Sequence, residues 1–245
     1  MLPAMSARAD RWEDLSAAFF GGKGKAINTP WRETWGGGEL LANSWSIYSG
    51  MSVSLSGDIT QPGWQLRTSG GYGQYSYQRA TEAPSGEHAR RSFSGRKIFS
   101  EVLVGHQWSF DSLTLKTLGG VTSERHFIDP RDPDNPVSGT EYGAKGALEA
   151  WLNVSSDRWL AADTSFDSAF NTFKVGMSSG YRISHDMSIG IEARFEMNDD
   201  YEAGRVGAFG TMRIGSAELT AAAGVTGDRD MQTSPYLRIG AFFRY

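Results

Sequence analysis

The chain of 245 residues contains no cysteine, so it has neither a disulfide framework nor a thiolate metal site. It also lacks an excess of basic residues: 24 Lys and Arg against 28 Asp and Glu give a formal charge of −4, which argues against a strongly basic nucleic-acid surface. Mean hydropathy is −0.40 and no apolar run approaches the length of a membrane-spanning helix. These absences leave a membrane β-barrel open, because each of its strands needs only about ten alternating residues and half of those face a polar lumen.

The chain is instead rich in glycine and aromatic residues, with 30 Gly, 8 Trp, 9 Tyr and 13 Phe. From Asn43 onward, segments that alternate apolar and polar positions recur, separated by breakers rich in Gly, Ser, Asp, Asn and Pro. Helical periodicity is hard to find. We predict eleven strands in this part of the chain, at residues 43–56, 63–79, 96–110, 113–126, 139–154, 157–168, 173–183, 187–197, 202–214, 217–227 and 236–245.

Two consecutive segments show the alternation most clearly. In residues 173–183 the odd positions are mostly apolar and the even positions small or cationic, and in residues 187–197 the even positions include Glu192, Arg194 and Glu196. Two-residue hairpin turns are predicted at 111–112 and 215–216, because their flanking residues then fall on the same apolar face. A soluble sandwich would alternate in the same way, so this pattern alone does not identify a membrane barrel.

Three further features favour the membrane barrel. Connections alternate in length, with short turns near 57–62, 111–112, 155–156, 184–186 and 215–216 and longer loops near 80–95, 127–138, 169–171, 198–201 and 228–235. Bacterial outer-membrane barrels have short periplasmic turns and long external loops. Aromatic residues that we expect in an interfacial girdle stand at strand ends: Trp64, Trp108, Phe110, Trp151 and Trp159.

The third feature is the last predicted strand, which ends on an alternating apolar series that resembles the signal read by the barrel-insertion machinery: Leu237, Ile239, Ala241, Phe243 and Tyr245. If Tyr245 lies on the periplasmic side, eleven strands place the start of the first one outside, so one more strand is needed. Residues 15–20 are the only apolar candidate, followed by an external loop through Trp31 and Trp35. The prediction is an all-β fold, a closed antiparallel up-and-down transmembrane β-barrel of about 12 strands.

The amino-terminal residues suggest processing. Residues 1–9 end in Ala7-Arg8-Ala9, which fits the small-residue rule at signal-peptide cleavage sites, with Asp10 opening the mature chain. Residues 1–9 are compatible with two interpretations, a signal-peptide remnant and a disordered start. We expect residues 10–245 to form a single barrel domain.

Charged residues of both signs lie opposite the apolar face. A salt-bridged interior without passage and a hydrated pore both fit them, because a barrel of this strand number has little spare width. In a pore, inward aromatic rings would offer sugar rings flat apolar faces, and these are Tyr48, Tyr75, Tyr77, Phe209 and Tyr236. The predicted lumen-lining residues are Arg67, Glu101, Lys116, Glu141, Lys145, Glu149, Lys174, Arg182, Glu192, Arg194, Glu196, Arg205, Arg213, Glu218, Arg238 and Arg244.

Motifs for catalysis or metal binding are weak. Residues 176–180 match G-x-S-x-G, but that motif activates its serine only at a sharp turn from strand to helix, and here it lies within a predicted strand. No two of the four histidines have metal-ligand spacing. The acidic segment 129–136 offers oxygen ligands for Ca²⁺, yet its three prolines favour a stiff solvated loop. We expect no catalytic residues, no metal and no cofactor.

Four stretches resemble the cellulose biosynthesis protein BcsS family: GWQLRTSGGYGQYSYQR at 63–79, VLVGHQWSFDSLTLKTLGGV at 102–121, GAKGALEAWLN at 143–153 and RVGAFG at 205–210. The resemblance covers roughly residues 36–245. It implies an outer-membrane barrel that supports bacterial cellulose biosynthesis or secretion, either as a narrow pore or with a plugged lumen, and without catalytic residues.

The resemblance also implies partners, namely cellulose-synthesis components or the glucan itself. To these we add the lipid bilayer, lipopolysaccharide and the barrel-insertion machinery, and we expect no nucleic acid. The alternative function is an outer-membrane lipid-modifying enzyme, a hydrolase-like barrel that acts on lipid A or phospholipid. A third reading is a soluble secreted β-sandwich, whose apolar face would be a buried core.

Overall fold

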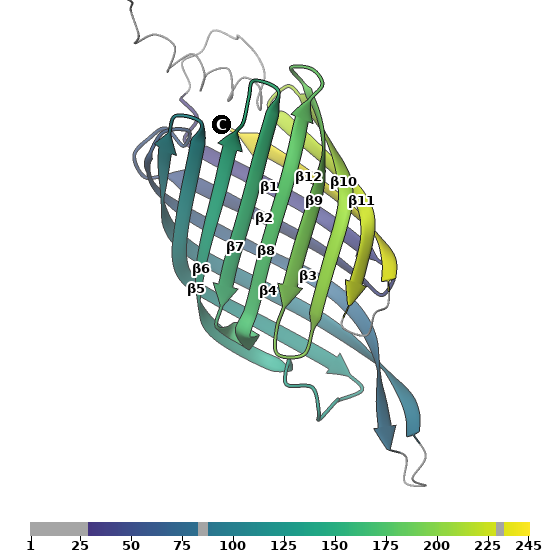
Figure 1. Ribbon diagram of the computed structural model, residues 1–245. Helices are drawn as coiled ribbons and strands as arrows, with labels where there is room; N and C mark the ends of the chain where they lie inside the picture. The colour runs from purple at the N-terminus through teal and green to yellow at the C-terminus, as the bar shows by residue number, and fades with distance from the viewer. Residues whose placement is uncertain (1–28, 83–87, 229–232) are drawn as a thin grey trace, which may run out of the picture.

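The computed structural model describes residues 29–82, 88–228 and 233–245. They form twelve antiparallel strands, each paired with its neighbours in the chain, and β1 pairs with β12 to close the barrel (Figure 1). The predicted fold class is therefore confirmed. Among the described residues no helix is long and apolar enough to cross a membrane.

The strands are β1 (Arg32–Leu41), β2 (Ser44–Ser54), β3 (Gly63–Glu82), β4 (His88–Phe110), β5 (Leu113–Asp129), β6 (Gly139–Asn153), β7 (Arg158–Asp167), β8 (Thr172–Arg182), β9 (Met187–Met197), β10 (Glu202–Ile214), β11 (Ala217–Asp228) and β12 (Thr233–Arg244), with a 3-10 turn η1 (Ala169–Asn171) before β8.

The barrel has two unlike ends. One, called here the turn end, carries the connections β2–β3, β4–β5, β6–β7, β8–β9 and β10–β11 together with the start of β1 and the carboxyl terminus. The other, the hairpin end, carries the remaining connections, and there β3 and β4 continue as a long two-stranded ribbon beyond the barrel wall (Figure 1). Chain entry and exit therefore lie together, as an even number of up-and-down strands requires.

Two tight turns at the turn end set the strand register as predicted. Phe110 pairs with Leu113 across residues 111–112, and Ile214 pairs with Ala217 across residues 215–216. The first central residue of each turn has a positive φ, 46° at Asp111 and 62° at Gly215. Such a backbone matches the right-handed twist of the strands, which is why Asp and Gly are favoured there.

Alternation along each strand separates an apolar outer surface from a charged interior. On β9, Ile189 and Ile191 are 51% and 67% exposed, whereas Glu192 between two outward residues is only 5% exposed. A soluble protein would bury the large aliphatic side chains and expose the acid. The reversed arrangement is that of a barrel whose outer wall contacts hydrocarbon.

Three sequence-based expectations are wrong in detail. The first strand of the barrel is Arg32–Leu41, so Trp35 lies in a strand and not in an external loop; residues 15–20, and residues 1–9 with them, fall outside the described part. The region 80–95 is mostly strand, because backbone pairing between β3 and β4 continues from Ser76 and Ser94 to Glu82 and His88 without needing apolar alternation.

The third error concerns the aromatic girdle. Trp64, Trp108 and Phe110 are exposed on the outer wall as expected, at 57%, 38% and 54%. Trp151 and Trp159 instead point into the barrel, because odd-numbered residues of β6 and β7 face the lumen together with Glu149. The sequence argument placed them by their position near a turn and overlooked their parity.

Glycines make room for aromatic rings that lie flat against the inner wall. Trp159 covers Gly180 on the neighbouring strand, where a Cβ atom would lie 2.2 Å from the indole. Phe209 covers Gly190 in the same manner, at 2.4 Å. Cross-strand pairs of glycine and an aromatic residue allow strong sheet curvature without leaving a gap. Part of the high glycine and aromatic content thus has a shared cause on the inner wall.

Lipid contact predicts a depth-dependent cost for outward charges. We expect Ile191→Arg, in the middle of β9, to lower the free energy of unfolding in phospholipid vesicles by about 2–4 kcal/mol. Tyr142→Arg, near the hairpin end of β6, should cost at most about 1 kcal/mol, because charges near the interface remain hydrated. Urea titration of both variants measures this, and equal costs at the two positions would contradict a hydrocarbon-facing wall.

Candidate functional site

The hairpin end of the lumen is filled by a cap of aromatic and polar side chains. The Tyr75 hydroxyl and His126 Nδ1 share a hydrogen bond of 2.8 Å, and His126 Nε2 lies 2.8 Å from Glu124 Oε1. Phe170, in η1, is 1% exposed and meets the His126 ring edge-on with centroids 5.1 Å apart. Tyr77 extends the cap by donating a 2.8 Å hydrogen bond to Asp132 Oδ2 in the β5–β6 connection. Little space remains at this end.

An ion pair also spans the mouth at the hairpin end. Arg79 on β3 lies 2.5 Å from Asp200 in the β9–β10 connection and 3.7 Å from Asp132. β3 and β9 are six positions apart in a ring of twelve strands, so they stand on opposite sides of the barrel. This contact therefore crosses the opening and links loops that have no backbone pairing with β3.

Further ion pairs join strands that are not neighbours across the lumen. Arg67 on β3 binds both carboxylate oxygens of Glu149 on β6, and Lys145 lies 2.5 Å from Glu101. On the other side Arg205 pairs with Glu39 and Arg238 with Glu192, each pair spanning three strand positions. A narrow barrel brings such side chains within reach of one another, and pairing offsets the cost of removing their charges from water.

The turn end is partly covered by the β2–β3 connection. Gln107, which points inward from β4 and is 3% exposed, donates hydrogen bonds of 3.1 Å to the carbonyl of Thr60 and 3.3 Å to that of Gln61. Ile59 in the same connection is 3% exposed. Below it, Glu33 binds Arg244 and lies 3.7 Å from Lys116 on β5. These contacts close the side of the lumen formed by β1 to β5.

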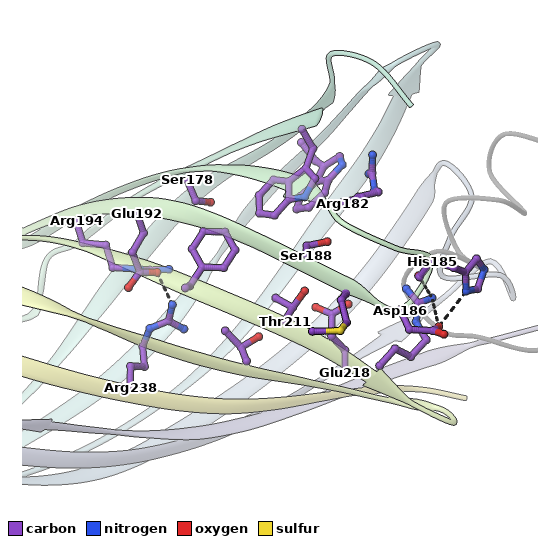
Figure 2. Close-up of a pocket in the computed structure, with 16 residues that line it drawn as sticks. Ser178, Arg182, His185, Asp186, Ser188, Glu192, Arg194, Thr211, Glu218 and Arg238 are labelled. Atoms are coloured by element: carbon purple, nitrogen blue, oxygen red, sulfur yellow. Dashed lines mark hydrogen bonds and ion pairs between the residues drawn. The ribbon is translucent and has the colours of Figure 1, made fainter. Parts of the chain in front are cut away.

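A pocket of about 170 Å³ remains at the turn end, beside the closed region and against β6 to β12 (Figure 2). The inward-pointing Trp151 and Trp159 line it together with Phe209, and β8 to β11 contribute hydroxyl groups to the lining. Its charged and polar lining residues are Ser178, Arg182, His185, Asp186, Ser188, Glu192, Arg194, Thr211, Arg213, Glu218, Thr220 and Arg238.

Stacked rings form one wall of this pocket. The Trp151 and Trp159 ring centroids are 4.2 Å apart with an interplanar angle of 22°, and Trp159 is 5.7 Å from Phe209. Because Trp159 lies over Gly180, the ring is held flat against the sheet. The indole N–H of Trp151 donates to Asn153, which also accepts a 2.9 Å hydrogen bond from Arg182.

The two ends of the pocket differ. At the inner end Glu192 pairs with Arg238 (Figure 2). Glu192 also accepts a 2.9 Å hydrogen bond from the Tyr236 hydroxyl. At the opposite end, next to the β8–β9 turn, Arg213 lies 3.5 Å from Asp186 and donates to the carbonyl of His185. The pocket is thus closed toward the lumen and bounded by a turn at its other end.

Most of the predicted lumen residues take part in the contacts just described. Lys174 pairs with Glu196 at 2.7 Å, and Glu141, at the hairpin end, accepts a 2.8 Å hydrogen bond from the Phe170 backbone N–H. The sequence argument missed the interior residues Glu33, Glu39, Lys97, Glu124, Trp151 and Trp159. Lys97, Glu124, Trp151 and Trp159 could have been found from the sequence, because each shares one face of its strand with charged residues.

The residues of the predicted insertion signal lie on the outer wall along β12, with Phe243 and Tyr245 at the turn end. Leu237 and Ile239 are 47% and 60% exposed, and Phe243 stacks against Tyr245 with centroids 6.3 Å apart. The carbonyl of Tyr245 accepts hydrogen bonds from the backbone of Trp31 and Arg32. Recognition of Leu237, Ile239, Phe243 and Tyr245 by the barrel-insertion machinery stays a prediction.

The described part of the chain offers little for catalysis or metal binding. Between residues 29 and 245, apart from the two gaps, no group of three or more His, Asp or Glu could hold a metal ion. Asp132, in the acidic segment, is already engaged by Tyr77 and Arg79. Ser178 lies inside β8, away from any helix, and His106 packs against the rings of Trp64 and Trp108 on the outer wall.

A closed twelve-stranded barrel with an apolar outer wall and a charged lumen defines the class of porin-like outer-membrane barrels. Two solved structures share the fold. The KdgM porin has a TM-score of 0.50 at 11% identity, covering 87% of this chain and 99% of its own, and the TodX deltaS2S3 mutant monoaromatic hydrocarbon channel has 0.52 at 6%, covering 90% of each chain.

The family is established from the sequence itself. The model of the cellulose biosynthesis protein BcsS family matches residues 34–245, and the protein belongs to that family. No curated protein is similar enough to the chain to count as a match. The protein is therefore an outer-membrane-type barrel linked to bacterial cellulose biosynthesis.

The buried carboxylate at the inner end of the pocket predicts a stability effect. Glu192→Gln leaves Arg238 without its counter-charge, so we expect the free energy of unfolding to fall by about 3 kcal/mol. Glu149→Gln should cost less than about 1 kcal/mol, because its side chain is 34% exposed and solvent screens the pair with Arg67.

A double-mutant cycle provides the control. Adding Arg238→Gln to Glu192→Gln should recover part of the lost stability, since the unpaired cation is removed. Urea unfolding in detergent micelles measures all four proteins. Additive effects of the two substitutions would show that the pair does not interact.

Proposed function

We propose that the protein is an outer-membrane component of bacterial cellulose production that acts as a closed scaffold and does not conduct the glucan. The family supports the link to cellulose, and the fold supports the membrane. In the outer membrane the turn end, with its short connections, would face the periplasm and the hairpin end would face the exterior, because bacterial barrels have short periplasmic turns and longer external loops.

The observation that carries the scaffold proposal is the obstruction of the lumen at successive levels. The Arg79–Asp200 pair crosses the outer mouth, and the Phe170 cap fills the space beneath it. Cross-lumen pairs such as Arg67–Glu149 occupy the interior. A passing polysaccharide would have to displace the cap and break several of these charge pairs at once, and the most deeply buried pairs, such as Glu192 with Arg238, cost a few kcal/mol to open.

The two other functions considered have weaker support. A narrow pore needs a continuous hydrated path, and in the described part of the lumen the cavities of about 170 and 40 Å³ are small and share no lining residue. A lipid-modifying enzyme needs a nucleophile beside a base, and within the described ranges His126 contacts a tyrosine and a glutamate while His185 contacts an aspartate. We therefore propose a role without catalysis.

Locking the mouth tests the scaffold directly, because the natural chain has no cysteine. Arg79→Cys combined with Asp200→Cys can be bridged by a bifunctional methanethiosulfonate reagent across the opening that the native pair spans. A scaffold should support the same surface cellulose output before and after locking, and purified protein should give no conductance steps in planar bilayers.

Single-cysteine variants treated with the same reagent are the matched controls for this experiment. Loss of cellulose output only in the bridged double variant, restored by a reductant, would establish a conduit and refute the scaffold. Stepwise conductance of the unmodified protein would do the same.

We also propose lipopolysaccharide as the lipid partner at the hairpin end. Arg96 on β4 and Arg125 on β5 are exposed on the outer wall, and Arg96 pairs in register with Phe127. Neither has an ion-pair partner within the described part of the chain; Arg125 lies level with the outward Ile98, and Arg96 lies two residues nearer the hairpin end. Guanidinium groups at that level suit the phosphate groups of an outer-leaflet lipid.

We expect Arg96→Gln combined with Arg125→Gln to weaken the binding of lipid A to the detergent-solubilised barrel about tenfold, because two charge-assisted contacts are lost. Arg158→Gln, an exposed arginine at the turn end, is the matched control and should change nothing. Native mass spectrometry of lipid A adducts measures both. Equal losses in the two proteins would refute a localised phosphate site.

A further inference from the structure

We propose that the turn-end pocket binds one terminal sugar unit of a β-linked glucan, presented from the periplasmic side. The ligand class rests on the proposed role in cellulose production, whereas the pocket itself rests on the structure. The scaffold would then contact the polymer directly: it would hold one end of the glucan chain and would not conduct the chain through the barrel.

The size of the pocket matches one ring. A cavity of about 150 Å³ in a protein interior accommodates benzene, and the present pocket measures about 170 Å³. One pyranose fills such a volume, while a second would project beyond it. The Glu192–Arg238–Tyr236 network blocks the inner end, so a ligand enters and leaves by the same side.

The lining offers the two kinds of surface that a sugar presents. A β-linked glucose unit has equatorial hydroxyls around its edge and axial C–H groups on its faces, so it prefers an aromatic plane with polar groups at the rim. The stacked Trp151 and Trp159 supply the aromatic wall. Ser178, Ser188 and Thr211 bring hydroxyls to the same cavity from three different strands (Figure 2).

The charged groups of the pocket are suited to a neutral ligand. Glu192 is paired with Arg238 and lies 3.9 Å from Arg194, and Arg213 is paired with Asp186. Arg182 is held by the Asn153 side chain and the carbonyl of Ser156, so most of the pocket's cations already have protein partners. Groups held in such pairs still direct hydrogen bonds toward hydroxyls without requiring a counter-charge from the ligand. A polyanionic sugar would bring its carboxylates against Asp186, Glu192 and Glu218, which line the same cavity.

The site is also built before the ligand arrives. Trp159 is fixed between Gly180 and Trp151, and Arg182 is held by Asn153 and by the carbonyl of Ser156. Binding then costs little side-chain ordering, which favours recognition of a weakly bound unit. The glycine and aromatic pattern of β7 and β8 thereby serves both sheet curvature and this pocket.

Calorimetric titration of the whole barrel in detergent with cellohexaose and cellobiose tests the proposal. We expect both to bind, with affinities within a few-fold of each other, because only the terminal unit enters the blind pocket. Oligogalacturonate should bind at least tenfold more weakly because of its negative charge. Maltohexaose should also bind at least tenfold more weakly, because the axial bond at C1 of its terminal unit directs the next unit against the pocket rim, whereas the equatorial bond of a β-linked unit leads it away in the plane of the ring.

Two substitutions locate the binding. Trp151→Ala should weaken cellohexaose binding about tenfold or more through loss of the stacking plane, and Thr211→Val, which preserves shape, should weaken it several-fold. Trp108→Ala removes a tryptophan from the outer wall and is the matched control, with unchanged binding. Heat-modifiable migration on gels confirms that each variant forms the barrel.

The results separate this inference from the scaffold proposal. An intact barrel that binds no cello-oligosaccharide at millimolar concentration, or binds it equally well after Trp151→Ala, would overturn the sugar site while leaving the locking experiment unaffected. Conversely, a conduit revealed by locking would overturn the scaffold and leave the measured affinity in place. Tighter binding of oligogalacturonate than of cellohexaose would assign the pocket to acidic sugars and overturn the neutral-glucan assignment.

Discussion

Closure of the sheet by pairing β1 with β12 is the constraint on which the other features depend. The register runs from Glu33 and Arg244 to Leu41 and Tyr236, so the described barrel has no unpaired strand edge along its wall. Each residue of a closed strand must point either outward or into the lumen. In a twelve-strand ring the lumen is narrow, and charged side chains from distant strands come within reach of one another.

This narrowness explains why the interior is occupied by ion pairs. A charge that faces a poorly hydrated space needs a counter-charge, and strands several positions apart supply it in pairs such as Lys116 with Glu33 and Arg205 with Glu39. The pocket persists where aromatic rings lie against glycines, and the Glu192–Arg238 pair bounds it on the lumen side. The same physical need therefore obstructs the lumen and defines the boundary of the pocket.

Much of the fold was predictable because its signal is local. Period-two alternation with turn residues located β2 to β12 to within a few residues, except for the extended β3–β4 ribbon. The sixteen charged positions assigned to the lumen from the same pattern enter the interior contacts or line the pocket, but the interior acids Glu33, Glu39 and Glu124 were missed. The first strand was missed because RETWGGGELL is dominated by glycine and shows weak alternation. The strand forms because both of its neighbours offer hydrogen-bonding edges.

The sequence by itself determined the class of fold and the sign of each face, since alternation and turn chemistry act between residues that are adjacent in the chain. It did not determine which charges meet. The contacts between Arg79 and Asp200, between Arg67 and Glu149, and between the rings of Trp151 and Trp159 depend on register, shear and closure. Those quantities arise only when all twelve strands are paired, so the obstruction of the lumen and the place of the pocket were decided by the tertiary structure.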